Sequence, residues 1–140
     1  MVERCSYTPP SSSAPDLVQG LPLNPRLAAA KSRLDRLDWW PAPVRIDGVR
    51  LWNAPWFFRL PWLRRFDGYA LHRIILLRTD DVSDDLVTHE LCHVWQMQHR
   101  PLRMPLSYLG TGYAANPYER QARAAVAATR SAGGQHGPVP

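Results

Sequence analysis

The stretch SDDLVTHELCHVWQMQH, residues 83–99, combines a helix signal with a candidate metal motif. Ser83 and the aspartates after it supply an N-cap and negative charge for a first helical turn. Pro101 blocks continuation at the other end. The apolar residues that flank the motif would bury such a helix: Leu86, Val87, Leu91, Val94 and Trp95. The pattern therefore predicts a buried helix from about Ser83 to His99.

The segment HELCH, residues 89–93, places two histidines four positions apart. On a helix such residues lie about 40° apart around the axis and ~6 Å along it, so His89 and His93 can bind one ion. Glu90 is about 100° away and can instead reach a water as a general base. The spacing predicts a zinc site with a catalytic glutamate. The alternative is a helix whose histidines are merely half-buried or solvated.

The segment NPYERQA, residues 116–122, offers a third ligand on a later helix. Asn116 and Pro117 suit a helix start, and Glu119 at the third position resembles a capping box whose carboxylate faces solvent. However, Ala122 and Val126 share the face of Glu119, which favours an inward direction. Catalytic zinc commonly takes two histidines and one carboxylate, so Glu119 is the expected third ligand.

Rival third ligands are His72, Cys92 and His99. Cys92 stands between the two histidines on one helix turn, where a thiolate cannot easily reach their ion, so a small buried hydrophobic role is favoured. His99 lies near the helix end and is expected at the surface. Glu119 remains preferred to all three.

HELCHVWQ followed by NPYERQA resembles the gluzincin group of zinc metallopeptidases, particularly its small single-domain members. The resemblance covers roughly Tyr69 to Ala132. It implies that His89, His93 and Glu119 bind zinc and that Glu90 is the base.

The resemblance also has a departure and an open question. Large gluzincins often carry an acid four residues beyond the third ligand, whereas this chain has Arg123, which could pair with Glu119 instead. The partner that orients a zinc histidine must then be another acid or a backbone carbonyl. The resemblance also implies a separate oxyanion-stabilising residue, for which Tyr108 and Tyr113 are both candidates.

The N-terminal half of the chain predicts a disordered segment, a helix and a hairpin. Residues 1–24 are rich in Pro, Ser and Thr and are expected to be disordered. A helix should begin at Pro25, with Asn24 as its N-cap, and end before Pro41. VRIDGVRLW, residues 44–52, predicts a β-hairpin around an Asp-Gly turn.

Four further segments complete the expected organisation. Residues 54–68 are aromatic and proline-broken, which favours a loop or short helix plugging the core over a membrane-touching patch. Residues 69–78 predict one buried strand. Residues 101–115 are expected as a loop, and a last helix should run from Pro117 to about Ser131. Gly133 should follow its end, within a flexible tail at 133–140.

Composition excludes several classes of protein. The net charge of +5 comes from 17 basic and 12 acidic residues, but the arginines are scattered without a nucleic-acid-binding motif, so no specific nucleic-acid binding is expected. The longest apolar runs fall far short of the ~18 residues of a transmembrane helix. No secretory signal is evident, which predicts a cytoplasmic protein. The 2 cysteines do not suggest a disulfide framework.

These observations predict an α+β, zincin-like domain over residues 25–132, with a small sheet, an HExxH helix and a second helix carrying the third ligand. The expected activity is zinc-dependent hydrolysis of peptide bonds in a peptide or protein substrate, with a protein partner as a source of specificity. The alternatives are a zinc-binding interaction domain without turnover and a non-metal scaffold or lipid-surface adaptor.

Overall fold

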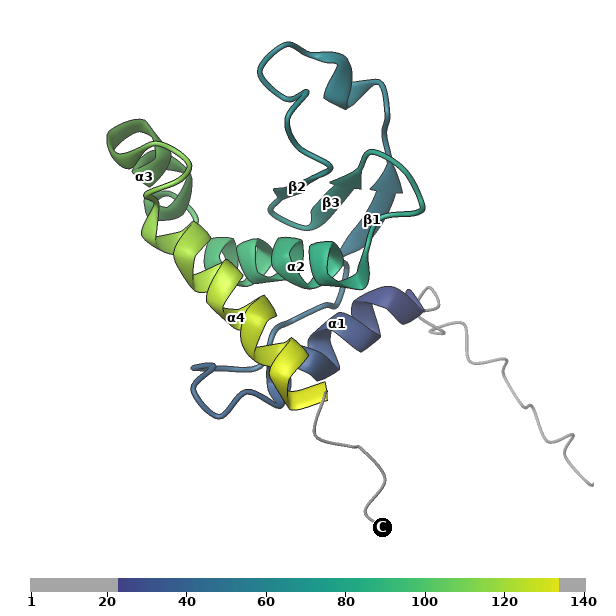
Figure 1. Cartoon of the computed structure of the whole chain (residues 1–140), viewed down its shortest axis with the longest axis vertical. Helices are drawn as coiled ribbons and strands as arrows, with labels where there is room; N and C mark the ends of the chain where they lie inside the picture. The colour runs from purple at the N-terminus through teal and green to yellow at the C-terminus, as the bar shows by residue number, and fades with distance from the viewer. Residues whose placement is uncertain (1–22, 134–140) are drawn as a thin grey trace, which may run out of the picture.

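The computed structural model describes residues 23–133 (Figure 1). This part of the chain has mixed α and β structure with a small sheet, as expected. The predicted disorder of residues 1–24 and the predicted tail lie almost entirely outside the described residues. The elements, in chain order, are α1 (Pro25–Asp35), β1 (Arg50–Asn53), the 3-10 helix η1 (Phe57–Arg59), β2 (Gly68–Leu71), β3 (Ile74–Leu77), α2 (Asp84–His99), α3 (Arg103–Thr111) and α4 (Pro117–Gly133).

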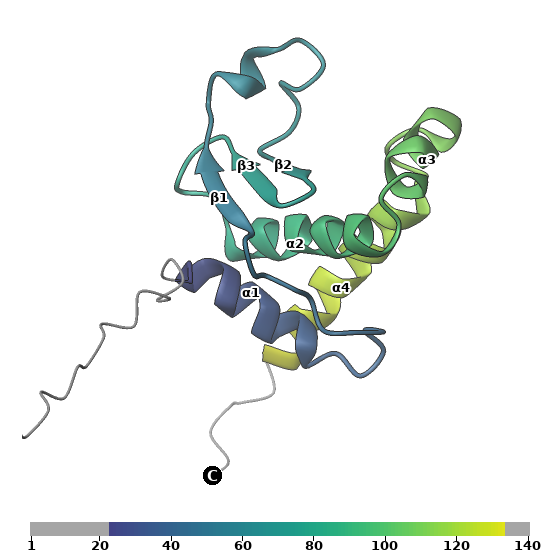
Figure 2. The same cartoon turned by 180° about the vertical axis from the view of Figure 1, so that it is seen from behind.

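Helix α2 is the centre of the fold. The sheet lies on one side of it, and α1 and α4 lie on the other (Figures 1 and 2). The predicted start is confirmed, because the Ser83 hydroxyl accepts a hydrogen bond from the Leu86 amide at 3.2 Å. Ten of its residues are buried, on nearly every side: Val87, Thr88, Glu90, Leu91, Cys92, His93, Val94, Trp95, Gln96 and Met97. Tertiary packing rather than a single apolar stripe therefore holds this helix.

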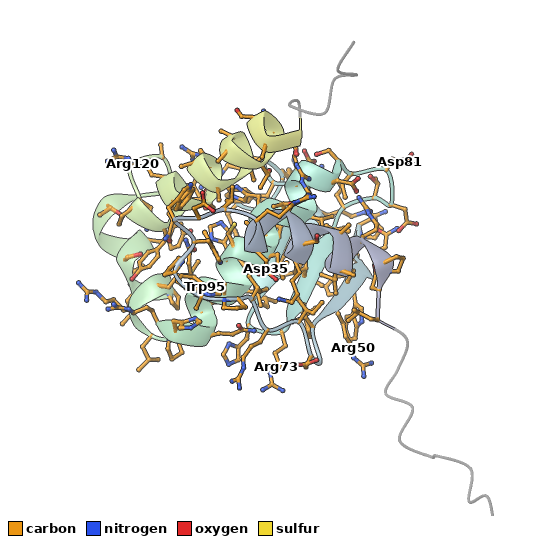
Figure 3. The ribbon with its side chains drawn as sticks, turned by 90° about the horizontal axis from the view of Figure 1, so that it is seen from below. Asp35, Arg50, Arg73, Asp81, Trp95 and Arg120 are labelled. Carbon is orange, nitrogen blue, oxygen red and sulfur yellow. The ribbon has the colours of Figure 1, made fainter. Side chains whose placement is uncertain are left out.

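Helix α1 begins as predicted, with Asn24 accepting from the Arg26 amide at 2.9 Å. It ends at Asp35, but the turns after it return apolar side chains to the core. The Trp40 ring packs against Trp95 with their centroids 4.9 Å apart. Figure 3 shows Trp95 among the side chains of the interior, whereas Arg73 lies at the rim.

The predicted hairpin at residues 44–52 is wrong. The turn exists, since Gly48 has a φ of +75° and the Val49 amide donates to Ile46 at 3.0 Å. However, the residues before it form no strand, and β1 instead pairs in parallel with β3. The apolar residues that alternate along this segment are all buried in the core: Val44, Ile46 and Val49. The alternation therefore belongs to an irregular buried connection and not to one face of a two-stranded ribbon.

The single strand predicted at residues 69–78 is also wrong, because the segment is a hairpin. His72 takes a φ of +49° and turns the chain, so that Leu71 pairs with Ile74 and Gly68 with Leu77. The resulting sheet has the order β1-β3-β2. β3 is therefore central, and β2 is an edge strand that runs beside α2.

Residues 54–66, here called the first lip, project from the sheet on the side away from α1 (Figures 1 and 2). Phe58 and Leu63 are buried, as the core-plugging prediction required, but Trp56 and Trp62 are each 67% exposed. Arg78 holds the base of the lip by donating from Nε to the Phe66 carbonyl at 3.1 Å. The first lip is thus a fixed structure with an apolar outer surface.

Residues 100–112, here called the second lip, lie almost entirely within the segment 101–115 that was predicted to be a loop, and this prediction is wrong. They contain α3, in which Pro105 is the third residue and so falls in the first turn, where its missing N–H breaks no helical bond. The following helix, α4, starts at Pro117 as predicted and runs through Gly133, which was expected just beyond its end. None of the described helices is long and apolar enough to cross a membrane.

A cluster of charged and hydroxyl side chains ties α1, α2 and α4 together. Asp85 on α2 accepts from Arg33 on α1 and, at 2.6 Å, from Arg130 on α4. Arg33 also donates to Thr88 and Thr129, each at 3.1 Å. The hydrogen bond from Arg33 and the charges of both arginines hold the pKa of Asp85 below its usual range, although partial burial opposes this shift.

Asp85→Asn should destabilise the fold, because it removes the negative charge that both arginines share. We expect the free energy of unfolding to fall by about 1.5–3 kcal/mol, the range for hydrogen bonds to charged groups. Asp84→Asn is the matched control, since Asp84 is also in the first turn but its side chain is 77% exposed. Thermal melts at neutral pH should separate the two variants.

The pH dependence provides a second check on the same variant. Because the pKa of Asp85 is lowered in the folded state, its contribution is present above the unfolded pKa of about 3.9 and is lost as the pH falls through the folded pKa. The difference between the wild type and Asp85→Asn should therefore shrink on acidification. A difference that grew in acid would contradict this account.

Candidate metal centre

The three predicted ligands meet at one point between α2 and α4. The Nε2 atoms of His89 and His93 are 3.1 Å apart. Glu119 faces both rings, with Oε2 at 3.3 Å from His89 Nε2 and Oε1 at 3.1 Å from His93 Nε2. Within the described residues, these three form the cluster of donors whose spacing could hold a metal ion.

Glu119 faces the histidines because another residue caps its helix. Asn116 Oδ1 accepts from the Tyr118 amide at 2.9 Å, which serves the start of α4. Glu119, in the first turn of the same helix, is only 1% exposed and shares its inward face with Ala122 and Val126. The inward direction expected from the face pattern is therefore what the structure has.

The donor set fits a small dication. Tetrahedral coordination with bonds of about 2.0–2.1 Å separates neighbouring ligand atoms by roughly 3.3 Å, close to the distances between these nitrogens and oxygens. Glu119 Oε2 is buried and accepts no hydrogen bond from the part of the chain that the structure describes. A buried carboxylate oxygen without a partner is costly, and a cation at this point would satisfy it.

Gln96 orients His93 and was not foreseen from the sequence. Its Nε2 donates to the Tyr118 carbonyl and to Gln121 Oε1, both at 2.9 Å, so its Oε1 must face His93. There it accepts from His93 Nδ1 at 2.8 Å, which leaves Nε2 of the neutral ring with its lone pair toward Glu119. An amide oxygen thus takes the place expected for an acid or a backbone carbonyl. The sequence feature that could have identified this contact is the spacing, because Gln96 follows His93 by three positions on the same helix.

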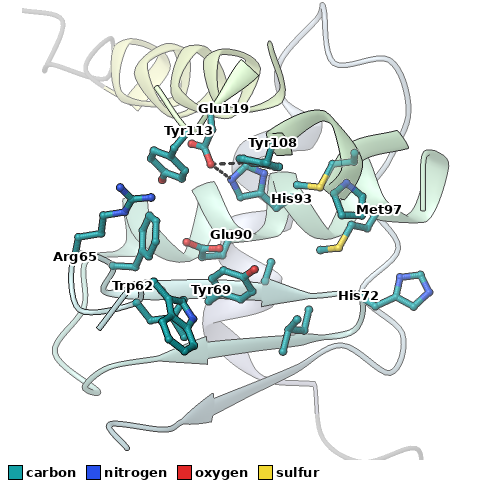
Figure 4. Close-up of a pocket in the computed structure, with 18 of the residues that line it drawn as sticks. Trp62, Arg65, Tyr69, His72, Glu90, His93, Met97, Tyr108, Tyr113 and Glu119 are labelled. Carbon is teal, nitrogen blue, oxygen red and sulfur yellow. Dashed lines mark hydrogen bonds and ion pairs between the residues drawn. The ribbon is translucent and has the colours of Figure 1, made fainter. Parts of the chain in front are cut away.

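Glu90 lies on the sheet side of His93, away from Glu119 (Figure 4). Its side chain is buried, and burial raises the pKa of its carboxyl even though both histidines act to lower it. Gly68 on β2 passes so close that an added Cβ would lie 2.9 Å from Glu90 Oε1. A residue without a side chain is therefore needed at position 68 to leave Glu90 its place.

Both candidate tyrosines lie beside Glu119 (Figure 4). The Tyr108 hydroxyl donates to Glu119 Oε1 at 2.9 Å, so it supports the carboxylate directly. The Tyr113 ring packs against Phe66 in a tilted arrangement with their centroids 4.9 Å apart, and burial raises the pKa of Tyr113 to about 12. Arg123 approaches Glu119 Oε2 only to 3.8 Å and is about half exposed, so the suggested competing ion pair is weak.

The rival ligands lie elsewhere. His72 occupies the turn between β2 and β3, at the far end of the cavity in Figure 4. Cys92 is fully buried in the core, where burial raises the pKa of its thiol. The ring of His99 stacks on Trp95 at 4.4 Å, near the end of α2.

The charges around the cluster favour a cation. Burial alone would raise the pKa of Glu119, but the nearby imidazoles of His89 and His93 hold it well below its usual range. Burial would lower the pKa of His93, but Glu119 and then Glu90 raise it overall. Glu119 and Glu90 thus place negative charge around the imidazoles, which favours a cation at the point where the candidate ligands meet.

Two cavities adjoin the cluster. The larger, of about 710 Å³, is bordered by His93, by both lips and by the whole of β2. The smaller, of about 440 Å³, is bordered by His89, Arg123 and the start of α2. Glu90, Gly68 and Tyr113 border both cavities, so these residues lie where the two spaces meet.

Comparisons of the chain with models of protein families, with curated proteins and with solved structures found no match. The gluzincin resemblance therefore stays a prediction.

Gln96→Leu should weaken metal binding without unfolding the protein. The substitution removes the acceptor that orients His93, and losing such an outer partner typically costs about 10–100-fold in metal affinity. Gln98→Leu is the matched control on the same helix, since Gln98 donates to the Arg45 carbonyl, away from the cluster. Calorimetric titration with zinc should show the loss in the first variant alone.

Glu119→Gln should reduce zinc affinity further, because it removes the charged donor itself. Glutamine can still accept from Tyr108, so the fold without metal is retained. We expect zinc to raise the melting temperature of the wild type strongly and that of the variant far less, since stabilisation follows the ratio of ligand concentration to its Kd. An equal rise in both proteins would exclude Glu119 as a ligand.

Proposed function

We propose that this chain is a zinc-dependent, zincin-like peptidase in which His89, His93 and Glu119 hold the metal and Glu90 is the general base. The observation that carries the proposal is the division of labour on α2. Two imidazoles face a buried carboxylate on α4, and the buried Glu90 borders the same cavity as His93 and Glu119. A site that only held a metal for structural reasons would not need Glu90.

The position of β2 supports a polypeptide as the substrate. β2 is an edge strand, since within residues 23–133 it pairs with β3 alone, and all four of its residues border the larger cavity. An extended chain can add to such an edge through main-chain hydrogen bonds. A bond of the substrate would then pass close to Glu90, where the two cavities meet.

The chemistry follows from what each group can donate or accept. A bound zinc ion supplies Lewis acidity, which polarises a carbonyl and lowers the pKa of water. The Glu90 carboxylate accepts a proton from the attacking water and passes it to the leaving amine. Burial keeps bulk water from competing for that proton.

We assign oxyanion stabilisation to Tyr113 rather than Tyr108. Tyr108 already donates its hydroxyl hydrogen to Glu119 and so acts by holding a ligand. Tyr113 borders both cavities together with Glu90, which suits a donor to a substrate carbonyl oxygen.

Glu90→Gln should separate metal binding from catalysis. Glu90 is not a donor to the metal, so zinc affinity should stay near that of the wild type. The turnover of unfolded protein or peptide substrates should fall by about 10²–10⁴-fold, the typical contribution of a positioned acid or base. A variant that binds zinc and hydrolyses substrate at the wild-type rate would refute the role of Glu90. A wild type that binds zinc but shows no turnover would instead support a zinc-binding interaction domain.

Gly68→Ala is a second test of the role of Glu90, and it leaves the Glu90 side chain itself unchanged. The new Cβ would displace the flexible end of Glu90, so kcat should fall while zinc affinity and thermal stability change little. Gly110→Ala is the matched control, because no atom of the described residues lies within 4 Å of a Cβ at that position. Equal turnover in both glycine variants would show that the position of the Glu90 carboxylate does not matter.

A further inference from the structure

The two lips expose apolar side chains that the metal site does not use. The five most exposed large hydrophobic residues of the described chain all lie on the lips: Leu109 (85%), Leu102 (75%), Trp56 (67%), Trp62 (67%) and Leu106 (60%). Exposed apolar patches of this kind commonly mark an interaction surface.

The leucines form one stripe on α3. Leu102, Leu106 and Leu109 follow the spacing that places residues on the same helical face. The opposite face is the one held to the protein, since Met104 is buried and Ser107 accepts from Asn116 Nδ2 at 2.8 Å. The stripe is therefore directed away from the body of the domain.

The first lip cannot fold its tryptophans back into the core, because that space is filled and its base is clamped. Phe58 occupies the interior of the lip, with the guanidinium of Arg78 5.4 Å from the centre of its ring. Arg78 also donates to the Phe66 carbonyl and pairs with Asp67 at 3.1 Å. The exposure of Trp56 and Trp62 is thus fixed in place.

Charge identifies the kind of partner. The lips carry five exposed arginines and no acid: Arg59, Arg64, Arg65, Arg100 and Arg103. The 12 acidic residues of the chain balance all the remaining basic residues, so the lips alone account for the net charge of +5. Trp, Leu and Arg together suit the boundary between anionic headgroups and acyl chains.

The arrangement of the lips suits a broad surface. Both lips rise on the same side of α2, away from α1 (Figures 1 and 2), and the larger cavity lies between them. A membrane can contact two separated projections at once and leave the cavity between them open.

We propose that the two lips dock this protein on an anionic lipid surface, with Trp56, Trp62 and the α3 leucines entering the interface. This docking does not depend on the metal. The cavity beside Glu90 then opens toward the membrane, so substrates are polypeptide segments held close to that surface.

The test is co-sedimentation of the full chain with vesicles of phosphatidylcholine, with and without phosphatidylserine. We expect binding only to the anionic vesicles, and weaker binding at high salt because screening reduces the attraction. Binding should be the same with a chelator, which makes this result independent of the proposed peptidase activity. A wild type that does not bind anionic vesicles overturns the proposal.

Matched variants locate the contact. Leu106→Ser combined with Leu109→Ser, or Trp56→Ser, should reduce the partition coefficient roughly tenfold or more, whereas Trp52→Ser on β1 should not. Arg59→Gln with Arg103→Gln should reduce it by about 25-fold, because each arginine near the surface contributes about fivefold. Arg50→Gln with Arg120→Gln is the control of equal charge, and thermal melts confirm that each variant is folded.

Two further results would overturn the proposal. The first is vesicle binding that the lip variants and the control variants retain equally. The second is a wild type that does not bind vesicles but self-associates, as measured by light scattering, when the lip variants do not self-associate. That result would assign the lips to a contact between two copies of the chain.

Discussion

A helix that is covered on nearly every side must satisfy its polar side chains within the protein, and α2 is such a helix. Thr88 accepts from Arg33 on α1, and Gln96 donates to α4. His93 is held by Gln96 and faces Glu119. The contacts with Arg33, Glu119 and the start of α4 tie α2 to its neighbours, so they fix both the packing of the helices and the positions of the candidate ligands.

This constraint also explains why the chemical groups fall on different sides of one helix. His89 and His93 face α4, which supplies the carboxylate, whereas Glu90 faces β2. The angle of about 100° between consecutive helical residues produces the separation. The sheet supplies none of the three candidate ligands. Its strand β2 passes close to Glu90 at Gly68, where the absence of a side chain leaves space for the carboxylate.

Long periodic segments were predictable, and short β elements were not. The helices at α2 and α4 were found from caps and apolar spacing, because those signals are local. The Asp-Gly turn was real, but a turn does not determine which strand β1 pairs with, and that partner lies beyond it at β3. His72 turned a predicted strand into a hairpin without the glycine or asparagine that usually marks such a turn.

In the site, the inward direction of Glu119 was predictable from the residues that share its helical face. The role of Gln96 depended on how α4 packs and could not be read from one helix.

The connectivity of the cluster has a consequence for folding. His89 and Glu119 come from helices on either side of α3, so an ion bound by both acts as a cross-link that closes the chain segment between them. Closing a loop removes conformational entropy from the unfolded ensemble, and the native state is stabilised relative to it. The segment inside this loop is the second lip, whereas the sheet and the first lip lie outside it. In the unfolded chain, metal binding would therefore restrict the second lip directly and leave the first lip unrestricted.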